Sequence, residues 1–401
     1  MILRTLVLLT ATAVFAQLAP AQSHFWNQGD PGNWSQDFQW SPTGTVPNSA
    51  SDWAALGVSD PTPYTVTMDM DVLLDRLELA AANLTLLLSG RELTVNTAAT
   101  IDNSILRLIS STVKGGGQVA NRWIIEALGG STIENLYNDG TLNVLGSPAG
   151  GTANLLLESP AYSEGTINLT SESGGYSAIL RTGTGTTLSN FGPLYFLPGA
   201  GGTRTFNGAL NNNFLTSVET NTAFTTGPIT NTQNTFHVLS GFTATLSSNT
   251  TFNMNGGIFQ NDGVFNQSNS EFNWNGGPLQ NLAPNLINTA LTLGASNNDT
   301  GALRVHGNST LNGVVRSGQN IDLVGSPMGS TATLTWQGTG DLFNYGTVNV
   351  LSESGGYSAN LVAPAGTRLL NNGGLTVFPG AGGSRNVNAD LLNDVAGTIS
   401  M

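Results

Sequence analysis

The sequence of 401 residues contains no cysteine, a single lysine (Lys114) and only 9% charged residues, against roughly 25% in a typical globular domain. The absence of cysteine excludes disulfide bridges and a lipid anchor on a cysteine. Acidic residues outnumber basic ones by 25 to 12, so a basic patch for nucleic-acid phosphates or an anionic membrane is not expected. We therefore predict no nucleic-acid partner, and no motif predicts a cofactor.

The segment 1–21 has the organisation of an export signal. Arg4 supplies a positive charge, an apolar run follows, and Ala19-Pro20-Ala21 matches the small-residue cleavage pattern. The alternative is a membrane anchor, but the run is shorter than the roughly 20 residues that span a bilayer. We expect an exported chain that begins at Gln22, has no integral membrane span and acts outside the cell or on a bacterial cell surface.

Short alternating segments are abundant, whereas no window shows a sustained helical period. Tyr64–Met68 and Leu93–Val95 alternate apolar and polar residues, which is typical of half-buried strands. The chain is also rich in glycine (50 residues), asparagine, threonine and serine. This composition predicts an all-β protein whose surface consists of neutral polar side chains.

Repeats show how the strands are arranged. The segment Phe252–Asn261 recurs as Phe272–Asn281, a shift of 272 − 252 = 20 along the chain. A repeat of this length is typical of one coil of a β-solenoid, with short strands joined by tight bends. Alternation places the aromatic residues inward and the asparagines outward, and the Gly-Gly pair is expected at a corner that needs a positive φ.

A looser Asn-x-Gly motif runs through the chain and predicts further corners. Its copies are spaced by about one or two coils, for example from Asn344 to Asn371. Each asparagine is expected to bond its own backbone and to pair with the asparagine of the next coil. The predicted fold is a parallel β-helix with coils of about 20–27 residues and an aromatic N-terminal cap. The predicted corner residues are Asn138, Gly140, Asn261, Gly263, Asn344 and Gly346.

A longer duplication is overlaid on the coils. The octapeptide Ser171–Ala178 (SESGGYSA) recurs at Ser352–Ala359, a shift of 352 − 171 = 181 along the chain. The repeats divide the chain into six predicted segments: 1–21 signal peptide; 22–60 Trp-rich cap; 61–132 first solenoid strands; 133–213 block copy 1; 214–311 Phe-Asn-Gly repeat coils; and 312–401 block copy 2, expected to be incomplete at its C-terminal end.

The segment that opens the mature chain contains four of the seven tryptophans: Trp26, Trp34, Trp40 and Trp53. We interpret them as a cap that covers one end of the stacked strands, because an open end would expose an unpaired edge. The alternative interpretation is that these rings stack on sugars.

This opening segment and the repeats resemble those of bacterial exported surface proteins. The spacing Trp26-x(7)-Trp34-Ser-x(4)-Trp40-x-Pro, followed by Val46-Pro47-Asn48 and Asp52, looks like the N-terminal module of autotransporter-like, haemagglutinin-like and PEP-CTERM-type proteins. The Asn-x-Gly units are similar to their β-helical repeats. The resemblance implies a right-handed β-helix, secretion and a role at the cell surface, outer membrane or an extracellular layer, without implying a particular chemistry.

The acidic residues offer few candidates for catalysis or metal binding. Asp69 and Asp71 are the tightest pair, and alternation predicts both carboxylates on one face of a strand. They are weak ligand-binding candidates, with a solvated strand face as the alternative. His237 and His306 lie in alternating segments and are predicted to point outward. No metal-ligand spacing, nucleophile elbow or phosphate loop is present.

The repeated octapeptide looks at first like an active-site loop. Each copy lies between two apolar strands, so we interpret it as a bend of a duplicated coil, with the glycines allowing the turn. Glu172 and Glu353 are expected to be exposed, and Tyr176 and Tyr357 to pack over the corner. These four residues also remain weak ligand-binding candidates.

Three functions are compatible with these features. We predict a non-catalytic structural or adhesive surface protein that contacts extracellular polysaccharide or cell-surface components through many weak contacts. A carbohydrate-active enzyme, either a polysaccharide lyase or a hydrolase, and a passive stalk for a further C-terminal domain are the alternatives. An exposed solenoid end would also permit self-association.

Overall fold

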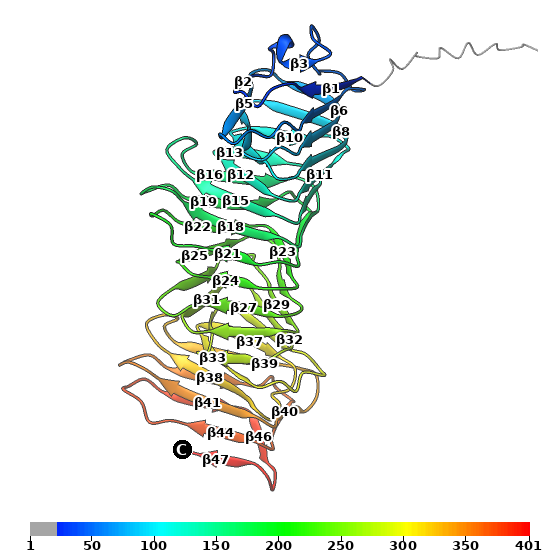
Figure 1. The fold of residues 1–401 in the computed structure, drawn as a ribbon. Helices are drawn as coiled ribbons and strands as arrows, with labels where there is room; N and C mark the ends of the chain where they lie inside the picture. Colours follow the sequence, from blue (N-terminus) through cyan, green and yellow to red (C-terminus); the bar gives the residue numbers. More distant parts are fainter. Residues whose placement is uncertain (1–21) are drawn as a thin grey trace, which may run out of the picture.

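The computed structural model describes residues 22–401, and the export signal predicted at 1–21 lies outside this range. The described chain is a parallel β-solenoid of about 16 turns (Figure 1). Its one helix is the 3-10 turn η1 (Asp37–Gln39), and no helix in this range is long and apolar enough to cross a membrane. The predicted all-β solenoid is confirmed.

The strands stack into ladders that run along the solenoid axis. Ladder A is a separate sheet made of β2(Gly32–Asn33), β5(Tyr64–Met68), β7(Leu84–Ser89), β9(Ile105–Ile109), β12(Ile124–Leu128), β15(Thr141–Gly146), β18(Thr166–Ser171), β21(Leu194–Phe196), β24(Thr216–Val218), β27(Thr235–Val238), β30(Ile258–Asn261) and β33(Leu279–Asn281).

Ladder B follows ladder A along the chain from β9 to β33 and then continues without it. It is made of β10(Thr112–Lys114), β13(Gly130–Ile133), β16(Ala153–Leu157), β19(Ala178–Thr182), β22(Arg204–Asn207), β25(Thr222–Thr225), β28(Thr243–Leu246), β31(Val264–Ser268), β34(Asn285–Ile287), β36(Gly301–His306), β38(Gln319–Gly325), β41(Thr347–Ser352), β44(Gly374–Val377) and β47(Thr398–Ser400).

Ladder C follows ladder B along the chain and is made of β4(Trp53–Leu56), β6(Val72–Leu79), β8(Glu92–Ile101), β11(Gln118–Asn121), β14(Leu136–Asn138), β17(Ala161–Ser163), β20(Thr187–Asn190), β23(Ala209–Asn212), β26(Ile229–Asn231), β29(Phe252–Asn255), β32(Glu271–Gly276), β35(Ala290–Leu293), β37(Asn308–Asn312), β39(Ala332–Gln337), β42(Ala359–Val362) and β45(Arg385–Asn388). Ladders B and C share the long strand β8, which pairs with both β10 and β11.

The coils are more variable in length than predicted. In ladders A, B and C beyond the cap, the sequence separation of paired residues on successive coils ranges from 17, between Asn121 and Asn138, to 27, between Asp322 and Asn349. The upper limit of the predicted range is confirmed and the lower limit is wrong. Short coils fit because a corner can be closed by a single left-handed residue, such as Asn135 with φ 52°.

Alternation along the strands fills the interior with apolar side chains. Phe252, Met254, Phe272 and Trp274 are fully buried, as the repeat predicted, and the ring of Phe252 stacks on that of Phe272 at 5.5 Å. Gly257 takes the predicted positive φ of 65°, whereas Gly256 does not. The core therefore continues without interruption from coil to coil, which is how a solenoid without disulfides is stabilised.

The duplicated blocks keep their order of strands but change ladder. In copy 1, β15 and β18 belong to ladder A, whereas the equivalent β38 and β41 of copy 2 belong to ladder B. Between the copies, β33 is the last strand of ladder A, and β36 adjoins two ladders. Thr300, just before β36, accepts a backbone hydrogen bond from Leu279, and Arg304 pairs with Asn285 of β34. A fourth, short ladder then opens: β40(Leu342–Asn344), β43(Arg368–Asn371) and β46(Asp390–Asn393).

The N-terminal end of the solenoid is covered by the predicted cap. β1(Ser23–Trp26) pairs antiparallel with β3(Trp40–Ser41), and the rings of Trp26, Trp34 and Trp40 pack edge to face and are fully buried. Trp53 differs from the prediction: it lies on β4, is partly exposed and contacts Phe25 on the outside of the coil.

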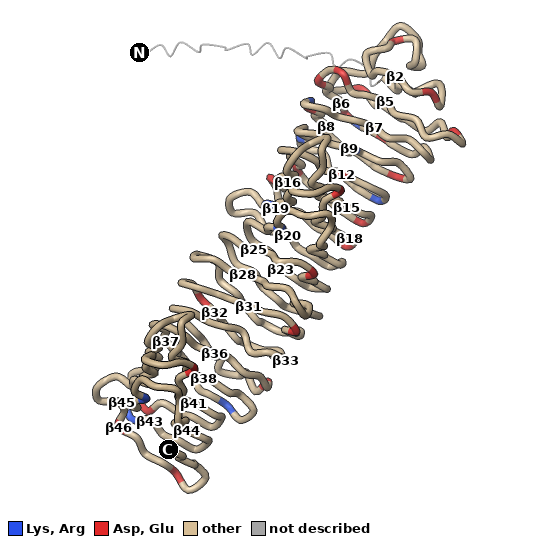
Figure 2. The backbone as a smooth tube through the Cα atoms, turned by 90° about the vertical axis from the view of Figure 1, so that its left-hand side faces the viewer, with Lys and Arg blue, Asp and Glu red and all other residues tan. Residues whose placement is uncertain are grey.

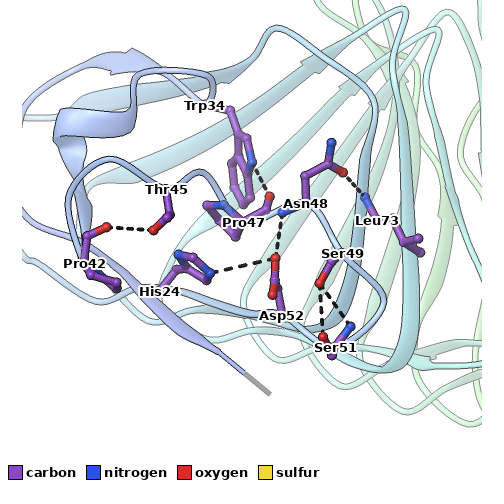
Figure 3. A network of polar contacts seen from close by, with 10 residues as sticks. All are labelled: His24, Trp34, Pro42, Thr45, Pro47, Asn48, Ser49, Ser51, Asp52 and Leu73. Carbon is purple, nitrogen blue, oxygen red and sulfur yellow. Dashed lines mark hydrogen bonds and ion pairs between the residues drawn. The ribbon is translucent and has the colours of Figure 1, made fainter. Parts of the chain in front are cut away.

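Hydrogen bonds hold the connecting loop of the cap against the first coils (Figure 3). The indole Nε1 of Trp34 donates to the carbonyl of Pro47 at 3.0 Å. The backbone N–H of Asn48 donates to the Asp52 carboxylate at 2.9 Å, and the Asn48 side chain accepts from the N–H of Leu73 at 2.8 Å. The Pro47-Asn48 and Asp52 motif is therefore used to fasten the cap.

Candidate functional site

Asp69 and Asp71 do not form the predicted pair on one strand face. Both lie in the corner between β5 and β6, where the chain is not extended. The Asp69 carboxylate accepts hydrogen bonds from the N–H and the hydroxyl of Ser35, at 3.0 and 2.5 Å. Burial raises the pKa of Asp69, but these hydrogen bonds together outweigh burial, so the pKa is lowered. Asp71 accepts from the N–H of Glu92 at 3.0 Å. Each carboxylate therefore fastens a different neighbouring segment, which accounts for both acids without a ligand.

The two SESGGYSA segments form bends between strands. Glu172 and Glu353 are exposed, and Tyr176 and Tyr357 are half-buried before the next strand begins. Loops of both blocks project from the same side of the solenoid, at the left of Figure 1 and toward the viewer in Figure 2. The two copies differ in one contact, because Glu353 pairs with the Arg304 guanidinium whereas Glu172 has no ion pair among the described residues.

His306 points inward, contrary to the prediction. It is 1% exposed, and its Nδ1 lies 2.9 Å from the hydroxyl of Ser326. Burial and the nearby Arg304 charge lower the pKa of His306 to about 4, although Glu353 opposes the shift. A serine beside a histidine is also a nucleophile–base arrangement, but Ser326 is equally buried, at 1% exposure, so a substrate has no access to it. His237 lies outward as predicted, 2.7 Å from Asp262.

The Asn-x-Gly corners have a clear structural role. Asn138 is fully buried, accepts from the side chain of Asn121 at 2.6 Å and donates to Ser163 at 2.9 Å. A Cβ on Gly140 would lie 2.4 Å from the carbonyl oxygen of Trp123, so the coils approach too closely for a side chain.

The other predicted corners follow the same pattern. Asn344 donates to Asn371 at 2.7 Å, and Asn261 donates to the carbonyl of Leu282 at 2.9 Å. Gly263 and Gly346 each face backbone oxygens at 2.4 Å from the position of a Cβ. The corners bind neighbouring coils together and leave these asparagines unexposed.

A groove that the sequence patterns did not predict lies at the corner between ladders B and C. Two open cavities lie there: one of about 570 Å³ over three coils, and one of about 560 Å³ over the next four. The first extends to Pro228 and the second begins with Asn249 and Thr251 of the next coil, where the N–H of Ile229 donates to the carbonyl of Thr251. We call the part of this corner that carries both cavities, from Arg181 to Thr310, the B/C groove.

A left-handed residue bends the chain sharply at this corner in each coil of the B/C groove. The left-handed residues along the groove are Gly185, Gly208, Thr226, Gly227, Asn249, Asn269, Asn288 and Gly307. The regular recurrence of asparagine at positions 249, 269 and 288 was the signal available in the sequence.

The walls of the B/C groove are almost entirely uncharged and combine polar and apolar surface. Its lining consists mainly of amides, hydroxyls and glycines, with Arg181 and Glu271 as its charged side chains. Figure 2 shows how sparse charged residues are along the whole tube. Within residues 22–401, no group of three or more His, Asp or Glu side chains could hold a metal ion. The groove is therefore suited to binding a polar molecule through hydrogen bonds.

No protein-family model, curated protein or solved structure matches the chain.

Proposed function

We propose that this protein is an exported, non-catalytic β-solenoid that binds extracellular polysaccharide and has a structural or adhesive role at the bacterial cell surface. The observation that carries the proposal is the B/C groove, which repeats neutral hydrogen-bonding groups on successive coils. Many weak contacts in a row give a polymer high avidity, even when each contact is weak. The resemblance to exported surface proteins and the sparse charge support the same role.

The proposal is tested with the purified mature chain and a panel of neutral and acidic polysaccharides. Retardation in affinity gel electrophoresis reports binding, and assays for reducing and unsaturated ends report hydrolysis and lyase activity. We expect at least one polysaccharide to retard the protein in the gel, without the release of new reducing or unsaturated ends. Release of new ends would show an enzyme instead, and the absence of binding to every polysaccharide would favour a passive stalk.

A further inference from the structure

We infer that the B/C groove binds one extended, neutral oligosaccharide chain that lies parallel to the solenoid axis, with about one sugar unit per coil. This inference rests on the proposed function and adds the site, the orientation and the class of ligand. The groove crosses seven coils, at Gly185, Gly208, Gly227, Asn249, Asn269, Asn288 and Asn308. At the strand spacing of about 4.8 Å, its six coil steps span about 30 Å.

The distribution of side chains in the groove indicates that the ligand lies along the solenoid axis. Four exposed asparagines stand at the same corner of four successive coils: Asn249, Asn269, Asn288 and Asn308. Asn288 donates to Asn269 at 3.2 Å, which orders part of this row. The side chain of Asn249 makes no hydrogen bond with any described residue. Both the carbonyl oxygen and the NH2 group of its amide are therefore free for a ligand. A row with this regular step matches a polymer that advances along the axis.

The chemistry of the groove favours hydroxyl groups over charges. Amides and hydroxyls both donate and accept hydrogen bonds, as sugar hydroxyls do. The partly exposed Thr251 and Thr310 add such groups beside the asparagines. The net charge of −13 and Glu271 in the groove oppose a uronate or sulfated chain. The ligand class is therefore a neutral glycan.

An extended peptide is a poorer fit, because peptides in grooves are held by free backbone groups at a sheet edge. Along the groove these groups are already paired between coils. The carbonyl of Pro228 accepts from the N–H of Leu210 at 2.9 Å, and that of Thr251 accepts from Ile229 at 2.8 Å. Only side chains remain available to a ligand at these positions.

The test uses Asn→Gly substitutions, because glycine keeps the left-handed backbone while removing the amide. Asn249 has φ 70° and Asn269 has φ 51°, so both N249G and N269G avoid backbone strain. The matched control is N103G, since Asn103 is exposed and has φ 59° but lies outside the groove. Circular dichroism and thermal unfolding establish that all variants are folded.

Binding of xylohexaose, cellohexaose, mannohexaose and hexagalacturonate to the mature chain is measured by titration calorimetry. We expect at least one neutral hexasaccharide to bind, with Kd rising about fivefold for each groove amide removed and unchanged in N103G. Neutral hexasaccharide binding that is unaffected in the N249G/N269G double variant would overturn the groove assignment and leave the proposed function standing. Binding of hexagalacturonate alone would overturn the neutral class. If none of these oligosaccharides binds, and no polysaccharide of the panel used to test the proposed function binds either, the proposed function is contradicted as well.

Discussion

The imidazole Nδ1 of His306, on the coil that precedes the second duplicated block, lies 2.9 Å from the hydroxyl Oγ of Ser326 inside that block. The equivalent residues at the first block are Leu128, which precedes it, and Ser147, inside it, whose hydroxyl is buried without a partner among the described residues. The Nε2 of His306 is likewise buried without a partner. The coil before the second block thus contains a buried titratable group where the coil before the first block has an aliphatic side chain.

This histidine predicts a loss of stability in mild acid. The unfolded chain binds a proton at His306 below pH 6.5, whereas burial keeps the folded chain unprotonated there until about pH 4. The free energy of unfolding therefore falls as the pH drops from 6.5 to 4, by on the order of 2–3 kcal/mol from this group. Urea unfolding followed by circular dichroism at each pH measures the slope.

The variant H306L is the matched control, because it introduces the residue found at the equivalent position, Leu128. It is expected to fold and to flatten the dependence of stability on pH between 6.5 and 4. His24, whose pKa burial also lowers, is present in both proteins and leaves a smaller residual slope. An unchanged slope in H306L would show that His306 is not the group that titrates.

Removal of a buried corner amide is expected to destabilise the solenoid. In N138A the side chains of Asn121 and Ser163 lose their partner inside the corner. We expect the free energy of unfolding to fall by about 1–3 kcal/mol. N143A is the control, since the partly exposed Asn143 pairs with Asn168 on the outer surface. We expect N143A to lower the free energy of unfolding by no more than about 0.5 kcal/mol. Equal losses in the two variants would contradict a special role for the buried row.

The corner glycines provide a steric test, for example Gly165, which follows Ser163 where the preceding coil has Asn138 of the Asn-x-Gly motif. A Cβ at position 165 would lie 2.1 Å from the carbonyl oxygen of Gly140, so G165A must push two coils apart. We expect a loss of about 2 kcal/mol or more. In G130A the new methyl group meets no atom within 4 Å, so its stability should change little. Thermal unfolding of the two variants side by side measures the difference.

The regular parts of this fold were predictable because they depend on local alternation and on repeat length. Phe252 and Phe272 lie where the repeat places them, and the SESGGYSA segments are bends. The prediction for Asp69 and Asp71 was wrong because the alternating sequence pattern continues through a corner, although the strand itself has already ended there. The prediction for His306 was wrong because alternation assigns a polar residue in a strand to the surface. A neutral imidazole can nevertheless occupy a buried position that holds a leucine in the equivalent coil. The B/C groove depends on left-handed backbone angles and on the stacking of distant coils, which periodicity does not describe.

Arg204 provides a further test by comparison of the two blocks. Its guanidinium is fully buried and donates to the carbonyls of four residues of its own loop and to the hydroxyl of Ser171, at 2.6 to 3.2 Å. R204M leaves these acceptors unpaired and is expected to cost about 3 kcal/mol or more. The equivalent Arg385 is partly exposed and donates to two carbonyls, so R385M should cost about 1 kcal/mol or less. Chemical denaturation that ranks the two variants in the opposite order would contradict this account.

Chain-length dependence of binding tests the central claim most directly. The account predicts that affinity for a neutral oligosaccharide series, measured by calorimetry on the mature chain, rises with each added sugar unit and levels off at about six units, one for each coil step of about 4.8 Å. The ligands should be recovered uncleaved. A disaccharide that binds as tightly as a hexasaccharide, or the appearance of shortened products, would contradict a non-catalytic groove that holds an extended glycan.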